Sequence, residues 1–144
     1  MDCRIVSGNE YGSVLVVSMD NRPLNQSWKI LVQAGTQSRP TGWVEEPAQI
    51  RLDNGSMVDG YKVVSFGRAP WSVVKPNLTV EVNHPRITKV TALDLNGNGR
   101  NQVAFDRTTA GIRFRFPEDA MYVILEASSD RPAVTRTQTK RVRE

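Results

Sequence analysis

Residues 111–116 constrain the fold of this chain more than any other segment. Their sequence, Gly-Ile-Arg-Phe-Arg-Phe, alternates apolar and charged side chains without a break. This period of two is typical of a β-strand with one buried face. Pro117 follows and has no N–H for a β-ladder, so it predicts the end of the strand. A strand of this kind needs neighbours beside it and a second layer over its apolar face, which predicts a layered β-protein.

Similar patterns recur along the chain, separated by turn-forming residues. Leu78, Val80, Val82 and His84 share one face of a predicted strand that ends at the margin of a sheet. Residues 13–19 form an uninterrupted apolar run, which is typical of a strand covered on both faces. Further strands are expected at residues 27–34, 61–66, 87–93 and 121–127.

These patterns together predict the fold class. We count eight to ten short strands, and no segment long enough for a helix has helical periodicity. We therefore predict an all-β fold, an antiparallel two-sheet β-sandwich of immunoglobulin-like or jelly-roll-like type. A closed β-barrel is the alternative.

Length and charge divide the chain into a domain and a tail. The 144 residues suffice for one hydrophobic core, and residues 1–130 are predicted to form a single β-sandwich domain. Residues 131–144 hold five basic residues and one acidic residue, so they account for the whole net charge of +4 and predict a basic, disordered tail. The neutral remainder argues against nucleic acid as a partner. No apolar run approaches the ~18 residues of a membrane span, so a membrane partner is not expected either.

Residues 35–47, GTQSRPTGWVEEP, are predicted to form a long functional loop, because they contain two prolines, two glycines and several small polar residues. The loop carries Trp43, and the face of a tryptophan can stack on the apolar face of a sugar ring. Arg39 and Glu45 flank it, and Tyr61 or Tyr11 could add a second aromatic surface. These residues are candidates for carbohydrate binding. The competing interpretation is that Trp43 anchors the loop over the sheet.

The other two tryptophans are interpreted as structural. Trp28 has the strand parity of Ile30 and Val32, which predicts packing in the core. Trp71 follows Pro70 and is predicted to close an edge of the sandwich.

No group of carboxylates in the sequence has the arrangement of a glycosidase. Such an enzyme needs two carboxylates that face one sugar. The candidates are Glu45, Glu46, Asp94 and Asp106. Glu45 and Glu46 are adjacent, and adjacent side chains rarely point to a common centre, so no catalytic residue is predicted.

Metal sites are not predicted either. Asp94, Asn96, Asn98 and Gly99 begin like a calcium-binding loop, but Phe105 stands where the bidentate glutamate is needed. The segment therefore predicts an Asn-Gly hairpin turn. The chain has one histidine and one cysteine, which are far apart in sequence, so we predict no zinc site and no cofactor.

Several separate patches of the sequence together suggest a family. They are Ser18-Met19-Asp20-Asn21-Arg22-Pro23-Leu24 followed by residues 27–32 and Pro40-Thr41-Gly42-Trp43, then Gly67-Arg68-Ala69-Pro70-Trp71, and then Val90-Thr91-Ala92-Leu93-Asp94 with Asn96-Gly97. Across roughly residues 11–127 the chain resembles the C-terminal accessory β-sandwich domain of multidomain glycoside hydrolases.

The resemblance implies a non-catalytic domain cut from a larger carbohydrate-active protein that is secreted or periplasmic. Its partner would be the catalytic domain of the parent chain, and an apolar surface patch is expected where that domain packs. The alternative is a carbohydrate-binding module that holds a polysaccharide through Trp43. A third hypothesis is an independent enzyme that uses Glu45 or Glu46.

Overall fold

The computed structural model describes residues 2–128, and this range folds as antiparallel β-structure with no α-helix. The strands are β1 (Cys3–Ser7), β2 (Gly12–Ser18), β3 (Lys29–Thr36), β4 (Ser38–Arg51), β5 (Met57–Val73), β6 (Leu78–Val82), β7 (Ile87–Leu93), β8 (Gly99–Gln102), β9 (Asp106–Arg107), β10 (Ile112–Arg115) and β11 (Tyr122–Ala127), with one 3-10 turn at Leu24–Gln26. The all-β prediction is confirmed, although eleven strands replace the expected eight to ten in this range. The predicted tail, residues 131–144, lies outside the described residues.

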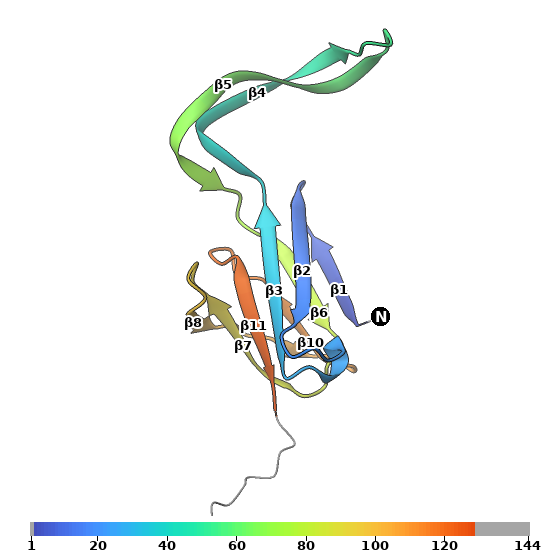
Figure 1. The fold of residues 1–144 in the computed structure, drawn as a ribbon, viewed down its shortest axis with the longest axis vertical. Coiled ribbons are helices and arrows are strands. Elements are labelled where there is room, and N and C mark those ends of the chain that lie inside the picture. Colours follow the sequence, from blue (N-terminus) through green and yellow to red (C-terminus); the bar gives the residue numbers. More distant parts are fainter. Residues whose placement is uncertain (1, 129–144) are drawn as a thin grey trace, which may run out of the picture.

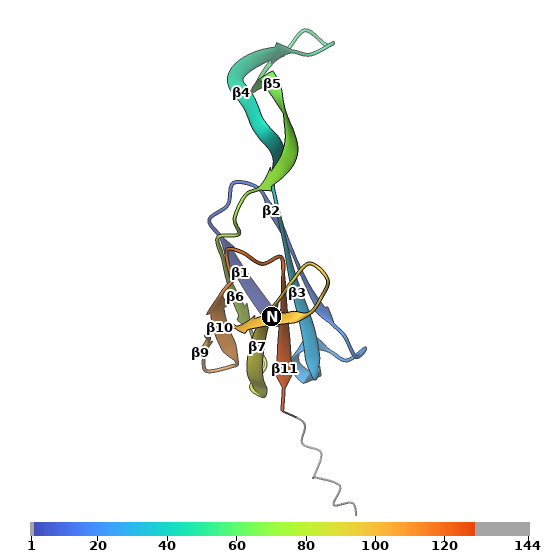
Figure 2. The same ribbon diagram turned by 90° about the vertical axis from the view of Figure 1, so that its left-hand side faces the viewer.

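Nine strands form two sheets, which we call the body (Figures 1 and 2). One sheet has the order β1-β6-β10-β9, and the other has the order β2-β3-β11-β7-β8. The buried side chains of both sheets belong to one hydrophobic cluster. In register, Phe114 lies opposite Val80 in the first sheet, and Val32 lies opposite Val123 in the second. Both sheets therefore contribute side chains to one common core.

The alternation in residues 111–116 is confirmed by the burial of its side chains. Ile112, Phe114 and Phe116 are at most 2% exposed, whereas Arg113 and Arg115 face solvent. The pattern in β6 holds in the same way, because Leu78, Val80 and Val82 are buried. His84 follows the end of β6 and is fully buried, as are the three side chains predicted to share its face.

The prediction that residues 13–19 are covered on both faces is wrong. β2 is an edge strand of the five-stranded sheet, and none of the described residues forms a layer over its outer side. Leu15, Val17 and Met19 are therefore 53%, 36% and 54% exposed. An uninterrupted apolar run indicates a strand but does not show that both its faces are covered.

β4 and β5 leave the body as a long two-stranded ribbon, which we call the arm (residues 38–73; Figures 1 and 2). The predicted loop at residues 35–47 is therefore wrong, because most of it belongs to β4. Pro40 and Pro47 pair with Trp71 and Tyr61 inside the ribbon. A two-stranded ribbon has two edges, and proline is tolerated at edge positions whose N–H would face outward.

The arm bends near its base, where two glycines have left-handed backbone conformations. Gly42 has φ of 80° and Gly67 has φ of 62°. A Cβ atom on Gly67 would lie 2.5 Å from the carbonyl oxygen of Thr41, so only glycine fits there without a shift of the backbone. The register of the ribbon also shifts between Pro40 and Thr41. The arm consequently curves over the end of the body that carries the turn between β1 and β2 (Figure 1).

Candidate functional site: the cleft between arm and body

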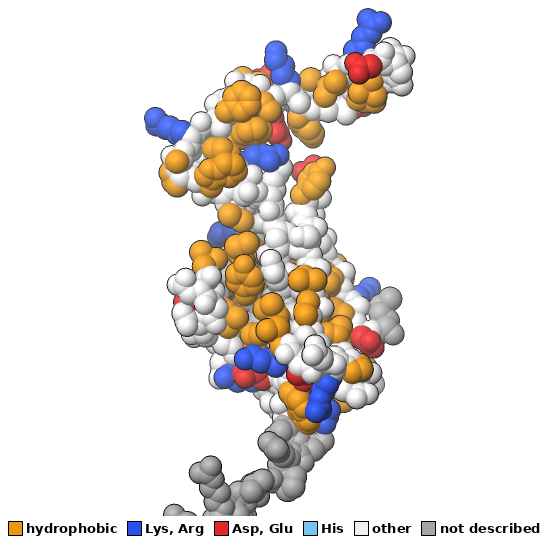
Figure 3. Space-filling model, in the orientation of Figure 1, with side chains coloured by type: hydrophobic (Ala, Val, Ile, Leu, Met, Phe, Trp, Pro, Cys, Tyr) orange, Lys and Arg blue, Asp and Glu red, His pale blue; other side chains and the backbone are white. Residues whose placement is uncertain are grey.

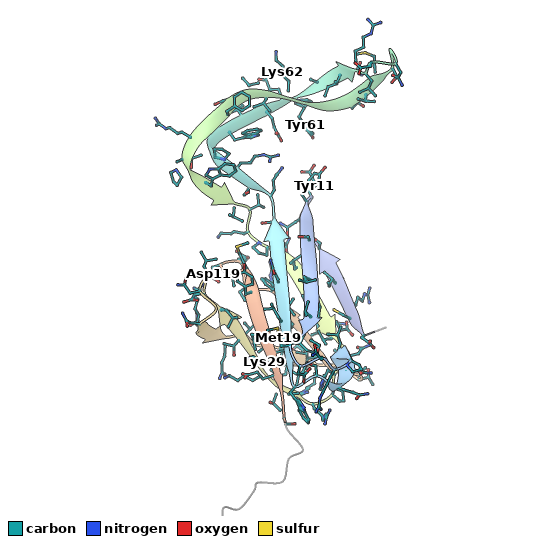
Figure 4. All side chains as sticks on the ribbon, viewed as in Figure 1. Tyr11, Met19, Lys29, Tyr61, Lys62 and Asp119 are labelled. Carbon is teal, nitrogen blue, oxygen red and sulfur yellow. The ribbon has the colours of Figure 1, made fainter. Side chains whose placement is uncertain are left out.

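A cleft of about 920 Å³ lies between the arm and the turn that joins β1 to β2. Tyr11 from this turn and Tyr61 from β5 point toward one another across it (Figure 4). The other lining residues are mostly small or polar: Glu10, Gly12, Ser13, Gly35, Thr36, Gln37, Arg39 and Glu45. Each wall is held by a hydrogen-bonded hairpin, because β2 pairs with β3 and β4 pairs with β5.

Behind the cleft, Trp43 holds Arg39 and Glu45 in place. The Cζ atom of Arg39 lies 4.9 Å from the centroid of the Trp43 ring, which is cation–π geometry. The indole N–H of Trp43 donates a hydrogen bond to Glu45 Oε2 at 2.9 Å. The Nη2 atom of Arg39 forms an ion pair with the same oxygen at 3.9 Å. Phe66 meets the Trp43 ring edge-on, with the centroids 5.8 Å apart. Trp43 thus orients the two charged groups that reach the cleft.

Three of the four residues expected to bind carbohydrate line this cleft, namely Arg39, Glu45 and Tyr61. Trp43 is half-buried beneath Arg39 and is not among the lining residues. Glu10, Ser13, Thr36 and Gln37 also line the cleft and were not found from the sequence. They come from the β1–β2 turn, the start of β2, the end of β3 and the residue after it, and no local pattern shows that the arm passes over them.

The cleft has the chemistry of a polar binding site with two aromatic surfaces. Arg39 Nε is buried and has no hydrogen-bond partner among the described residues. Glu45 uses its Oε2 for Trp43, and no hydrogen bond to its other oxygen is found in residues 2–128. The arrangement can therefore both donate to and accept from a hydroxylated ligand.

The four carboxylates weighed for catalysis do not come together at this cleft. Glu45 lines it, whereas Glu46 lies opposite Lys62 on the other face of the ribbon. Asp106 belongs to β9 in the body. Asp94 holds the turn between β7 and β8 and accepts the N–H groups of Asn96 and Asn98 at 2.9 and 2.8 Å.

The Asn-Gly hairpin turn is confirmed at this position. The backbone N–H groups of Asp94 and Gly97 close the turn on Asn98 and Asp94, and Gly97 has φ of 85°. The hydrogen bonds from Asn98 lower the pKa of Asp94, because they favour the charged carboxylate. Within residues 2–128, no three His, Cys, Asp or Glu side chains gather as metal ligands would.

A second polar cluster lies where residue 20 meets the start of β3, and its contacts are structural. Asp20 Oδ1 accepts the hydroxyls of Ser18 and Ser27 at 2.7 and 2.8 Å, and its Oδ2 accepts the N–H of Trp28 at 2.8 Å. Burial raises the pKa of Asp20, but these hydrogen bonds outweigh it and hold the pKa far below its usual range. His84 Nε2 lies 2.9 Å from the carbonyl oxygen of Ser27. The cluster ties the chain before β3 to the core.

Both predictions for the structural tryptophans are wrong. Trp28 is only half-buried and lies just before β3. Its ring contacts two guanidinium groups. The Cζ atoms of Arg22 and Arg86 are 5.0 and 4.7 Å from its ring centroid. Trp71 lies in β5 on the arm and is 66% exposed, so it does not close an edge of the body.

The surface of the arm is unusually apolar. None of its residues 38–73 is buried. Exposed large apolar side chains occur along its whole length (Figure 3), and they are Val44, Ile50, Leu52, Met57, Val58, Tyr61, Val64, Phe66, Trp71 and Val73. Figure 3 also shows apolar groups over the five-stranded sheet of the body. A surface of this kind is typical of a contact with another protein.

Comparison with known proteins gives no assignment. No family model matches the sequence, and neither the curated proteins nor the solved structures contain a significant match. The relation to glycoside hydrolases therefore stays a prediction from sequence patterns. Among residues 2–128 there is also no helix with the length and apolar character needed to cross a membrane.

Proposed function

We propose that this chain is a non-catalytic module that acts by docking on another protein through its arm. The observation that carries this proposal is the arm itself, in which no residue is buried and ten large apolar side chains are exposed. A two-stranded ribbon is only marginally stable alone in water. Packing against a partner would remove this apolar surface from water and would stabilise the ribbon.

The body acts in this proposal as the scaffold. Its two sheets share one hydrophobic cluster, which supports a two-sheet β-sandwich of immunoglobulin-like or jelly-roll-like type. The core contains Phe114, Phe116 and Leu125 and gives the module its stability. The arm emerges between β3 and β6 and extends away from this scaffold (Figure 2).

The partner we propose is the catalytic domain of a glycoside hydrolase in the same parent protein. The sequence patterns shared with accessory domains of such enzymes suggest it, and the expected apolar patch has a counterpart on the arm. The module itself would carry no hydrolytic centre. The carboxylates that were candidates for one are dispersed over the arm and the body.

The test compares this chain with the longer protein encoded by its native gene. Hydrogen–deuterium exchange should show residues 38–73 exchanging fast in the isolated chain and slowly in the longer protein. The neighbouring domain, purified separately, should bind the chain in trans. Replacing Phe66 and Trp71 by serine should weaken that binding at least about tenfold, because both side chains are largely exposed apolar anchors.

Leu95→Ser is the matched control, because Leu95 is 78% exposed but lies in the turn between β7 and β8. It should leave binding unchanged. Equal exchange of the arm in both proteins would reject docking through the arm. A native gene without a glycosidase domain would reject the proposed partner but not the docking.

A further inference from the structure

The cleft between arm and body has the size and shape of a site for an extended small ligand. Its volume of about 920 Å³ is near the upper end of the roughly 300–1,000 Å³ common for ligand sites. It is open to solvent, and Tyr11 and Tyr61 are 68% and 58% exposed. A ligand that binds here would therefore keep much of its surface in water, which suits a polar molecule.

The two tyrosines supply opposing aromatic walls. Tyr11 comes from the short turn between β1 and β2, and Tyr61 comes from the paired part of β5 (Figure 4). Both side chains have only two rotatable bonds to order on binding, so they contribute contact area at small entropic cost. A pyranose ring presents apolar C–H groups on its faces and hydroxyls around its edge, which matches aromatic walls with polar groups between them.

The polar groups of the cleft match hydroxyls. Arg39 lines the cleft, and its partly exposed guanidinium can donate to a hydroxyl. Thr36 and Gln37 add a hydroxyl and an amide from the end of β3. Glu45, held by Trp43, adds an acceptor.

The charge of the cleft selects among glycans. Its charged lining residues are Glu10, Glu45 and Arg39, two negative groups against one positive group. Sulfated, phosphorylated or uronic-acid glycans would be repelled by this excess of negative charge. A neutral ligand meets no such penalty.

We infer that the cleft between Tyr11 and Tyr61 is a binding site for a neutral oligosaccharide. The inference can be tested apart from docking through the arm, because Phe66 and Trp71, the anchors proposed for docking, do not line the cleft; Tyr61 alone belongs both to the apolar surface of the arm and to the cleft. It assigns the aromatic role to the two tyrosines, and it gives Trp43 the role of positioning Arg39 and Glu45.

Isothermal titration calorimetry of the full chain tests this with hexasaccharides of neutral glucan, xylan, mannan and galactan. Oligogalacturonate and alginate oligosaccharides serve as anionic probes. At least one neutral series should bind with Kd between ~10 µM and ~1 mM. Tyr11→Ala and Tyr61→Ala should each weaken it about fivefold or more, through loss of an aromatic face. Arg39→Met should weaken it similarly.

Leu95→Ala is the control, since it removes an exposed apolar side chain from the turn between β7 and β8, outside the cleft, and should leave Kd unchanged. Thermal melts of each variant should match the parent, because Tyr11 and Tyr61 are exposed. The proposal is overturned if no neutral series binds below ~10 mM, or if anionic oligosaccharides bind better. The proposal is also overturned if neither tyrosine substitution changes the Kd, or if saccharide binding disappears when the neighbouring domain is added. Release of shorter sugars would instead refute the non-catalytic function.

Discussion

The body and the arm are built from the same antiparallel pairing but differ in what covers their side chains. In the body, Phe114 faces Val80 across a strand pair, and both are at most 2% exposed because they belong to the hydrophobic cluster that the two sheets share. In the arm, Trp43 faces Phe66 in the same way, yet Phe66 is 73% exposed. Cross-strand pairing alone does not bury a side chain; a second layer does. The body therefore contains the buried core of the molecule, whereas the side chains of the arm stay at least partly exposed to solvent.

The largest expected effect comes from truncating the same residue type in each region. Phe116→Ala removes a ring that is 1% exposed in the core of the body, and it should cost ~3–5 kcal/mol in the free energy of unfolding. Phe66→Ala removes a ring from the arm and should cost less than ~1 kcal/mol. Guanidinium denaturation measures both. Similar losses for the two variants would contradict the division between body and arm.

A smaller effect should appear as the pH is lowered, and it should arise in the body. Burial lowers the pKa of His84 below its ordinary value of 6.5, although the hydrogen bond to Ser27 opposes this, and the nearby Arg86 lowers it further. The unfolded chain then binds a proton more readily than the folded chain. The stability that His84 contributes is therefore complete above about pH 6.5 and is lost as the pH falls toward the folded-state pKa.

Denaturation midpoints measured between about pH 7.5 and pH 5 check this, because few carboxylates titrate in that window. His84 is the only histidine in the chain, so no other imidazole contributes to the slope. The slope should disappear in His84→Gln. Hydrogen exchange of the arm should not change over the same range. A slope that persists without His84 would show that another group is responsible.

The smallest expected effect on stability is that of removing the arm. Ser38 and Val73 are paired at its base, so residues 39–72 can be replaced by Asn-Gly, a two-residue hairpin connection. The free energy of unfolding should change by less than ~1 kcal/mol, because no buried residue is lost and the shorter connection costs less entropy to close. The same variant should lose both docking and saccharide binding. A large loss of stability would mean that the arm supports the body.

The fold of the body could be predicted from sequence because burial there follows the strand period. Ile112, Phe114 and Phe116 show this directly, since each apolar side chain points into the core and each intervening arginine points out. In the arm, residues 61–66 were predicted as strand, whereas residues 38–47 were not. Pro40, Gly42 and Pro47 usually interrupt strands, but a ribbon with two edges accepts prolines, and its bend requires the glycine.

The candidate site could be predicted only in part. Arg39, Trp43 and Glu45 have the same parity, which is consistent with one side of a strand, and they do lie together. Tyr61 was expected near them, and β5 places it there by pairing with Pro47. Thr36 lies within the predicted segment 35–47 but was not singled out, and Glu10 had no signal in the sequence, because its place in the cleft depends on how far the arm curves. The exposure of Trp71 was not predicted for a similar reason. The residues around Trp71 do not indicate that no second layer covers this part of β5.

The bend at Gly67 has a consequence for how this protein can vary. A side chain at that position would press against the backbone of Thr41 and Trp43, so a replacement requires the backbone at the bend of the arm to shift. A substitution at Gly67 is therefore expected to alter the width of the cleft and the direction of the exposed apolar surface together.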